Sequence, residues 1–439
     1  MSCCLAAALF LHGAPLAAQQ QRSVNEQRLR ATLEKLSEFG RPEGAGFEGG
    51  VTRLGFSEED LAARRWLVDQ MREAGLEVRV DQAGNIFGRR EGTDSNLPVL
   101  LFGSHIDSVP NGGNFDGDVG SMGALEVMRA LHEQKGQTRH PLEMVIWVNE
   151  EGHHFGKGLF GSSAAAGLMD AGVLERRDGQ GMTVADWLRR YGQDPARFAD
   201  ARIPRGRLAA YVELHIEQGA VLDEAKTQIG IVQGIVGIHW YTCRVTGFAN
   251  HAGTTPMNRR QDALAAAARA ALAVREEVRR VAGRQVGTVG YMKVEPGARN
   301  IIPGRVEFPV ELRDLDAGKV ERIWGRIQER FAAIGREENA TISCEPLQGD
   351  KPALTDPAIR AAIAEAARAA GYSTMELPSG AGHDAQQIAT LAPVGMIFVP
   401  SRGGISHSPR EFTDWADIAN GAEVLYRTIL LLDQRLDAK

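Results

Sequence analysis

The chain has 439 residues, with 50 Lys and Arg against 56 Asp and Glu, which gives a net charge of −6. This length predicts two domains, or one large domain with an insertion. With 43% hydrophobic and 24% charged residues, the composition is that of a globular protein and argues against disorder, collagen and coiled coil. The charge balance provides no basic field for phosphate backbones or anionic lipids, so we expect no nucleic-acid and no membrane partner.

The N-terminus, MSCCLAAALFLHGAPLAAQQ, contains an apolar stretch from Cys3 to Ala18 that ends in small residues. It resembles the apolar core and cleavage region of a secretory signal peptide, although no Lys or Arg precedes it. If residues 1–18 are a signal peptide, the mature chain is periplasmic or secreted; otherwise we expect a cytoplasmic protein. Of the cysteines outside this stretch, Cys243 and Cys344, separate buried thiols are the expected state, with pairing as the alternative in an oxidising compartment.

Helix and strand patterns alternate through the first half of the chain. Residues 25–74 are expected to be helical, with Ser57 as the N-cap of a helix that runs to Met71. The segments that follow are expected to be a hairpin at 76–90, a buried strand at 98–108, a helix at 123–134 and a buried strand at 142–152. This order is typical of an α/β sandwich, in which ligands bind at the carboxyl ends of the strands.

The pattern changes at about residue 230. The next segments predict a βαββαβ unit, with a strand at 234–251, a helix at 262–282, strands at 286–297 and 304–315, a helix at 318–339 and a strand at 340–347. The α/β pattern then resumes with a helix at 358–371, a strand at 394–401 and a helix at 419–436. We therefore predict a catalytic domain in two parts, 23–229 and 346–439, interrupted by an inserted domain at 230–345.

Polar clusters follow two of the predicted strands. The glycine-rich segment GSHIDSVPNGGNFDGDVG carries His105, Asp107 and Asp116. The segment NEEGHHFG carries Glu150 and Glu151, whose carboxylates repel each other unless a cation or a proton lies between them. Either cluster alone is weak evidence for a functional site. A His-x-Asp pair occurs by chance, and two adjacent glutamates more often lie on a solvated surface loop.

Two further histidines complete a set of possible metal ligands. His215 lies in ELHIEQG and His407 in GGISHSP, and each alone would be read as an ordinary core or surface histidine. Together with the two acidic clusters they supply the nitrogen and oxygen donors that two divalent ions need when they share one carboxylate.

A family resemblance rests on an ordered set of motifs: GSHIDS, NGGNFDGDVG, NEEG, ELHIEQG, NHAGTTPM, RNIIPGRVEF, ELRD, GAGHDA and GGISHSP. The set resembles the binuclear metal amidohydrolases that include N-carbamoyl-L-amino-acid hydrolase, allantoate amidohydrolase and β-ureidopropionase, a branch of the aminoacylase/carboxypeptidase-like metallopeptidases. The resemblance covers the chain from about Asn25 to Leu432. It implies a zinc-exopeptidase-like catalytic domain with a mixed sheet, and a ferredoxin-like inserted lid that also forms a homodimer contact.

The resemblance implies a role for each cluster. Asp116 is expected to bridge two divalent ions, zinc or else manganese or cobalt, and Glu150 to act as the general base on the water between them. Asp107 is expected to orient the ring of His105. The remaining expected ligands are His105 and His215 on one ion, and Glu151 and His407 on the other.

The resemblance also implies residues for the substrate, a small molecule that carries a carboxylate. Gln218, Asn300 and Arg313 are expected to bind this substrate, the last two through its carboxylate. For Arg313 the alternative is a surface ion pair with Asp314 or Asp316. Two histidines complete the set: His251 is expected to donate to the developing oxyanion, and His383 is either a substrate-side or gating residue or a structural one.

The motifs are consistent with several functions. Because related aminoacylases have a carboxylate where this chain has His215, the first expectation is hydrolysis of the ureido C–N bond of N-carbamoyl-L-amino acids or allantoate. The alternatives are an aminoacylase or dipeptidase acting on N-acyl amino acids, and a catalytically silent protein that binds an amino-acid derivative. The chain has His153 and His154 where relatives commonly have an Arg-Phe pair. We expect both at the surface or packed against the metal ligands, with a changed pocket charge or additional metal donors as the alternative.

Overall fold

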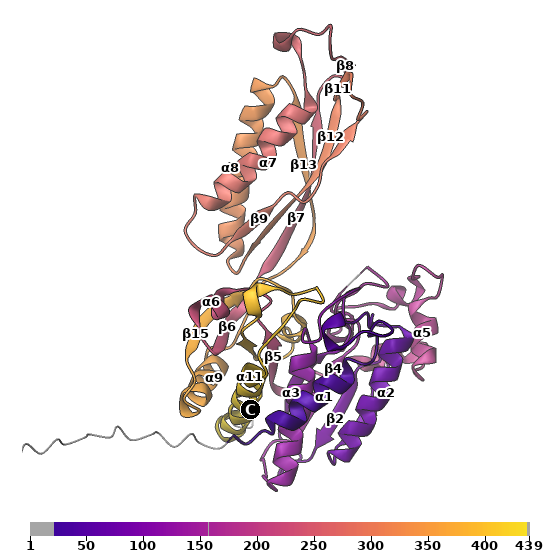
Figure 1. Cartoon of the computed structure of the whole chain (residues 1–439), viewed down its shortest axis with the longest axis vertical. Coiled ribbons are helices and arrows are strands. Elements are labelled where there is room, and N and C mark those ends of the chain that lie inside the picture. Colours follow the sequence, from indigo (N-terminus) through magenta and orange to yellow (C-terminus); the bar gives the residue numbers. More distant parts are fainter. Residues whose placement is uncertain (1–21, 157, 437–439) are drawn as a thin grey trace, which may run out of the picture.

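The computed structural model describes residues 22–156 and 158–436. A broad α/β part contains both ends of the described chain, and a narrower part projects from it (Figure 1). The predicted signal peptide at residues 1–18 lies outside the described residues. Within those residues, no helix has the length and apolar character that crossing a membrane requires.

A nine-stranded sheet, counted over the described residues, forms the centre of the α/β part. Its strands are β1 (Glu77–Val80), β2 (Ile86–Arg90), β3 (Val99–His105), β4 (Leu142–Trp147), β5 (Leu208–Ile216), β6 (Ile229–Ile235), β14 (Ala353–Leu354), β15 (Thr374–Ser379) and β16 (Val394–Val399). β4, β3, β5 and β16 lie in this order and run parallel, while β1 and β2 extend the sheet as antiparallel strands. Every residue of β3 and β4 is buried, as their continuous apolar runs predict.

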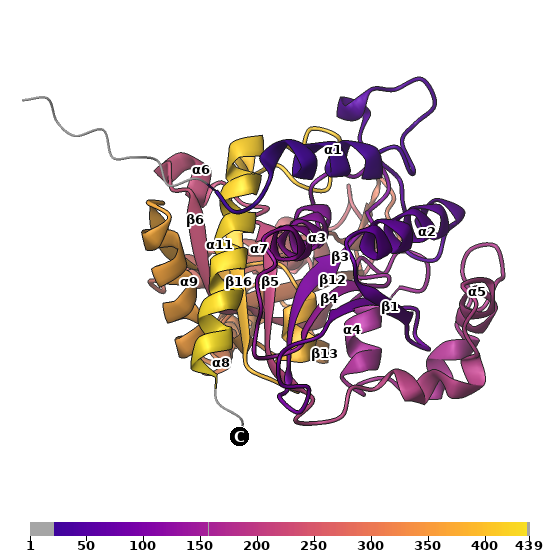
Figure 2. The same cartoon turned by 90° about the horizontal axis from the view of Figure 1, so that it is seen from below.

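Helices cover both faces of this sheet (Figure 2). One face carries α1 (Glu26–Leu36), α2 (Glu58–Glu73), α3 (Asp118–Glu133), α9 (Pro357–Ala369) and α11 (Trp415–Arg435). The other face carries α4 (Phe160–Ala165), α6 (Val221–Ala225) and α10 (Asp384–Ile388). Successive strand residues serve opposite faces, so Leu100 packs in the first core and Leu101 in the second.

Two helix predictions differ in extent from the structure. The segment predicted as helical at 25–74 is α1 and α2 with an irregular stretch between them; Ser57 caps α2, as expected, by accepting the N–H of Asp60. The helix predicted at 123–134 begins earlier, at Asp118. The remaining short helices of this part are α5 (Val184–Arg190), η1 (Phe47–Gly49), η2 (Ala171–Glu175), η3 (Pro195–Ala201) and η5 (Arg402–Gly404).

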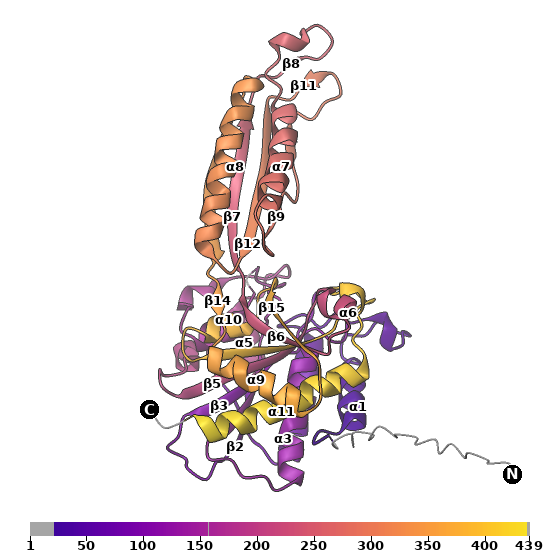
Figure 3. The ribbon, with the colours of Figure 1, turned by 90° about the vertical axis from the view of Figure 1, so that its left-hand side faces the viewer.

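The projecting part, residues 237–350, is here called the lid domain. It consists of β7 (Gly237–Thr246), α7 (Ala263–Arg279), β9 (Val286–Thr288), β10 (Lys293–Glu295), β12 (Arg305–Asp314), α8 (Ala317–Glu337) and β13 (Thr341–Asp350). α7 and α8 pack side by side on one face of its sheet (Figure 3) and enclose a separate apolar core. The strand predicted at 286–297 is divided into β9 and β10, which both pair with β12. At the tip lie β8 (Asn250–His251), β11 (Ile301–Ile302) and η4 (Met257–Arg259).

The predicted limits of the insertion, 230 and 345, need correction. β6 pairs with β14, β15 and β16 of the large sheet and therefore belongs to the α/β part, and β13 of the lid domain continues to Asp350. The partners of β6 come from chain segments more than a hundred residues away, which a local apolar pattern does not reveal. The expectation of separate thiols is also wrong, because Cys243 and Cys344 lie opposite each other on β7 and β13 and form a disulfide.

Candidate metal centre

The predicted ligands meet at one edge of the large sheet. His105 is the last residue of β3 and His215 lies near the end of β5, while Glu151 follows β4. Because these strands are parallel neighbours, their carboxyl ends open onto the same edge. Asp116 lies just before α3, and His407 comes from the loop before α11.

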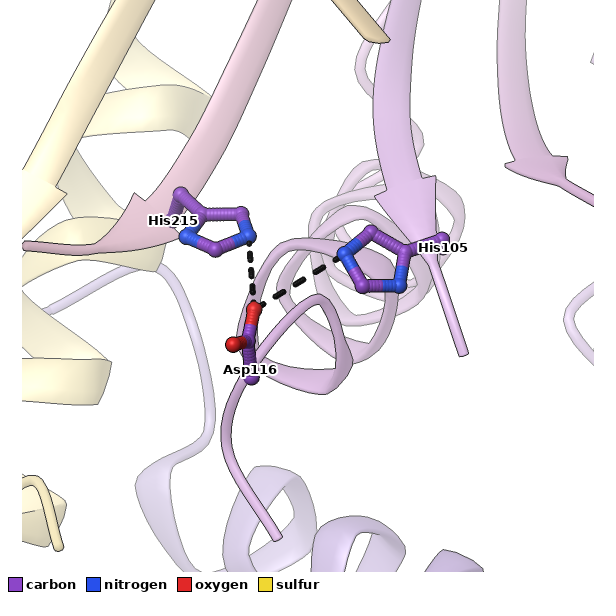
Figure 4. Close-up of side chains that lie close together, drawn as sticks. All are labelled: His105, Asp116 and His215. Atoms are coloured by element: carbon purple, nitrogen blue, oxygen red, sulfur yellow. Dashed lines mark ion pairs between the residues drawn. The ribbon is translucent and has the colours of Figure 1, made fainter. Parts of the chain in front are cut away.

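The two oxygens of Asp116 face different donors. Its Oδ1 lies 3.2 Å from Nε2 of His215 and 3.8 Å from Nε2 of His105 (Figure 4). Its Oδ2 lies 3.1 Å from Nε2 of His407, and the same nitrogen lies 3.5 Å from Oε1 of Glu151. Asp116 thus belongs to two donor groups, and within each group the donor atoms lie within 4.8 Å of one another.

The tautomers of two histidines suit metal binding. Nδ1 of His105 lies 3.0 Å from the carbonyl oxygen of Asp107, and Nδ1 of His215 lies 3.0 Å from that of Ile216. A carbonyl oxygen can only accept, so each Nδ1 carries the hydrogen. In the neutral form of each ring Nε2 then carries the lone pair and is the nitrogen that faces Asp116, and in His215 it also accepts the N–H of Gly117 at 3.2 Å. Two lone pairs facing a carboxylate fit a cation between them.

The electrostatics of the cluster also fit a cation. Burial and the neighbouring Glu151 carboxylate raise the pKa of Glu150 well above its usual range, and burial and the charge of Asp116 do the same for the pKa of Glu151. Burial lowers the pKa of His105 to about 4. Burial also opposes the charged form of His215, but its hydrogen bond to Asp116 and the charge of that residue raise its pKa to about 9. The crowded carboxylates therefore favour a cation beside them, while burial opposes a positive charge on the ring of His105 itself.

Asp107 contacts the ring of His105 through its backbone and lies near it with its carboxylate. The carboxylate was predicted to orient His105 and has its Oδ1 3.8 Å from Nδ1 of that ring, while the hydrogen bond to Nδ1 is made by the backbone carbonyl of Asp107. The side-chain oxygens instead accept the N–H groups of Glu150 and Glu151, at 3.0 Å each. These two hydrogen bonds, made by an almost fully buried carboxylate, fix the turn that carries the two glutamates.

A cavity of 1220 Å³ lies between this cluster and the base of the lid domain. Gln218 and Arg313, two of the predicted substrate residues, line it. Gln218 has a positive φ of 58° and donates from Nε2 to Oδ2 of Asp116 at 2.7 Å. Arg313 pairs with Glu311, not with Asp314 or Asp316, and Nη1 donates to the carbonyl of Gly380.

His383 also lines the cavity, beside His105 and His215. Its ring packs edge-on against His215 at a centroid distance of 4.5 Å, and its Nε2 lies 2.8 Å from Oγ of Ser379. It is 2% exposed and stands at the N-terminus of α10. The side chain is therefore held firmly at the cavity wall, which suits either of its predicted roles.

His251 and Asn300 do not line this cavity. They lie together at the tip of the lid domain, where Ala252 donates its N–H to the carbonyl of Asn300 (Figure 1). Nδ1 of His251 accepts the N–H groups of Gly253 and Thr254 at 3.0 and 3.2 Å. The proton of the neutral ring is therefore on Nε2, and the exposed ring presents a donor to solvent.

Neither histidine after the glutamate pair joins the donor groups. His154 places Nδ1 3.0 Å from the carbonyl of Phe56 and stacks on Trp187, and His153 is exposed. The sequence interpretation missed Glu411 and Ser406, which contact Asp116 from the loop of His407. The one available signal was their position within four residues of His407.

Residues 101–431 match the model of peptidase family M20/M25/M40. The chain belongs to this family. Members of peptidase family M20/M25/M40 are metal-dependent, which agrees with the two donor groups around Asp116. Membership also confirms the resemblance read from the motifs and the α/β fold with mixed sheets.

Similar members of peptidase family M20/M25/M40 match almost the whole chain. The N-carbamoyl-L-amino acid amidohydrolase of Geobacillus stearothermophilus is 45% identical and the match covers 94% of this chain and 99% of that protein. The allantoate amidohydrolase of Bacillus subtilis is 36% identical, and the match covers 90% of this chain and 94% of that protein. The crystal structure of a hydantoinase/carbamoylase family amidase from Burkholderia multivorans superposes with a TM-score of 0.87. Its sequence is 38% identical, and the match covers 93% of this chain and 98% of that chain.

Proposed function

We propose that this chain hydrolyses the ureido C–N bond of N-carbamoyl-L-amino acids and that its metal centre holds two divalent cations. The observation that carries the proposal is the Asp116 carboxylate, whose two oxygens face separate donor groups beside Glu150 at the cavity wall. The similarity to a named N-carbamoyl-L-amino acid amidohydrolase at 45% identity supports the substrate class.

The donor chemistry suits zinc, manganese or cobalt. His105, His215 and Asp116 would hold one ion, and Asp116, Glu151 and His407 would hold the other. Divalent cations held there would lower the pKa of bound water and polarise a carbonyl oxygen.

Glu150 moves the proton in this proposal. Its side chain is 12% exposed, faces the cavity and has an Oε2 3.9 Å from Nε2 of His105. It accepts a proton from the water that attacks the ureido carbonyl and returns it to the nitrogen of the amino acid as the C–N bond breaks. The carbamate released on the other side decomposes to carbon dioxide and ammonia, so the products are amino acid, carbon dioxide and ammonia.

The substrate carboxylate binds at the side of the cavity nearest the lid domain. Arg313 engages Glu311 through Nε and Nη2 and Gly380 through Nη1, and each terminal nitrogen carries a further N–H for a carboxylate. Gln218 reaches the same cavity beside Asp116. These two residues orient the substrate so that its ureido group meets Glu150.

His251 and Asn300 act from a second copy of the chain. Both lie at the tip of the lid domain, far from the cavity formed by their own chain (Figures 1 and 3). The chain is therefore proposed to form a homodimer through the lid domain, in which each tip reaches the partner's cavity. There Nε2 of His251 donates to the oxyanion, and Asn300 binds the substrate carboxylate.

A substrate panel tests the proposed reaction. Metal-loaded protein is offered N-carbamoyl-L-amino acids, allantoate, β-ureidopropionate and N-acetyl amino acids, and ammonia and free amino acid are measured for each. We expect ammonia and amino acid from the N-carbamoyl-L-amino acids, and neither product from metal-free protein. Turnover of allantoate alone would reassign the substrate, turnover of the acetyl compounds alone would make the chain an aminoacylase, and no turnover of any compound would favour a binding protein.

A further inference from the structure

His407 differs from the other histidines of the metal centre in how it is held. His105 and His215 lie on central strands and are at most 2% exposed. His407 lies on an irregular loop between η5 and α11, has a positive φ of 53° and a side chain that is 50% exposed. Such a loop does not by itself fix a ligand to the accuracy that a metal requires, so its position depends on other contacts.

Glu411 supplies those contacts. It is 4% exposed and follows His407 on the same loop. Its Oε1 accepts the backbone N–H groups of Phe115 and Asp116, at 2.9 and 3.1 Å. Its Oε2 accepts the hydroxyl of Ser406 at 2.6 Å, and that hydroxyl also lies 3.1 Å from Oδ2 of Asp116.

One buried carboxylate therefore joins two chain segments that lie about three hundred residues apart. The first segment carries Asp116 and the second carries His407. The connection is closely packed, since a Cβ added to Gly113 would lie 2.1 Å from Oε1 of Glu411. Glycine at this position allows the carboxylate to approach the backbone.

We propose that Glu411 is a positioning residue that fixes Asp116 and His407 relative to each other, two of the three ligands in the group Asp116, Glu151 and His407, and thereby sets how tightly the second of the two ions is held. The inference rests on the two-ion centre of the proposed function and adds a residue that acts on one ion more than on the other. The ion between His105 and His215 depends less on Glu411, because both of those ligands are held by strands. Outer residues that orient metal ligands typically change metal affinity by about 10- to 100-fold.

The segments have a second connection that should keep a Glu411 variant folded. Phe115 packs edge-on against Phe412 at a centroid distance of 5.4 Å, and both rings contact Trp415. This aromatic cluster does not involve Glu411. Loss of the carboxylate should therefore release the ligand geometry without separating the two segments.

The test measures the zinc bound per chain while zinc-loaded full-length protein is dialysed against increasing chelator. For Glu411→Ala we expect one of two equivalents to leave at about 10- to 100-fold lower chelator concentration than in the wild type, with the other retained. Glu411→Gln should behave as the wild type, because its amide oxygen can accept from both N–H groups and its NH₂ can donate to Ser406. Gly113→Ala, which displaces Glu411, should reproduce the alanine variant.

Asp433→Ala is the matched control. Asp433 is also buried and also accepts two consecutive N–H groups, those of Arg139 and His140, but from the far end of α11. This variant should retain both equivalents as the wild type does, even if its melting temperature falls. A similar loss of zinc in this control would mean that reduced stability, and not ligand geometry, explains the result.

The outcomes separate this inference from the proposed function. If wild-type protein holds two equivalents and Glu411→Ala also holds both, or loses both together, the role of Glu411 is wrong. If Glu411→Gln loses zinc as readily as the alanine variant, the negative charge of Glu411 and not its geometry determines zinc retention. That result also overturns the inference. Wild-type protein that holds fewer than two equivalents would instead contradict the two-ion centre itself.

Discussion

Replacing Glu150 with Gln is expected to lower kcat on an N-carbamoyl-L-amino acid by about 10³-fold while KM changes little. Glutamine has the shape of the glutamate but no basic oxygen that can take the proton of the attacking water. The N–H of residue 150 is held by Asp107 regardless of the side chain, so the turn should keep its geometry. Steady-state kinetics together with the metal content of the same sample measure the effect.

Asp350→Asn is the control for this variant. Asp350 is an exposed carboxylate that lines the same cavity from the base of the lid domain, and we assign it no part in the reaction. Its replacement should leave kcat within a few fold of the wild type. Full activity of Glu150→Gln with both ions bound would remove Glu150 as the general base.

Replacing His251 with Ala is expected to lower kcat by about 10²- to 10³-fold, the usual effect of removing one oxyanion donor. The contacts of Nδ1 with Gly253 and Thr254 leave the proton on Nε2, and this fixed tautomer is the physical basis of the expectation. Zinc content should not change, because His251 belongs to neither donor group of the metal centre. Loss of zinc in this variant would contradict the assigned role.

Co-expression of His251→Ala with Glu150→Gln tests whether the donor comes from the partner subunit. In a mixed dimer, one cavity combines an intact Glu150 with an intact His251 from the other chain. Random pairing in a two-fold dimer then restores about a quarter of the wild-type activity. No recovery in a purified mixed dimer, or a monomer by light scattering, would contradict the proposed arrangement.

Local sequence patterns were sufficient for the two buried strands that end at the candidate metal centre. The apolar runs that end at His105 and before Glu150 identified two buried strands, and their polar ends identified the edge of the sheet where the ligands meet. The helix cap at Ser57 and the two helices of the lid domain also followed from local signals. In each case the residues that decide the structure lie close together in the chain.

Contacts between distant segments were not predictable in this way. Glu411 reaches the backbone of Asp116, and β6 pairs with strands formed by much later segments. The pairing of Cys243 with Cys344 depends on the register between β7 and β13. The hydrogen bonds of the Asp107 carboxylate to the N–H groups of Glu150 and Glu151 depend on the path of one turn. None of these leaves a periodic pattern in the sequence.

The most direct test of the account is a metal titration of activity. Protein stripped of metal is given measured equivalents of zinc, manganese or cobalt, and ammonia release from an N-carbamoyl-L-amino acid is followed at each loading. We expect no turnover without metal, and activity that rises until two equivalents per chain are bound. Undiminished turnover in the metal-free protein, or no turnover at any loading with any of the three metals, would contradict the account.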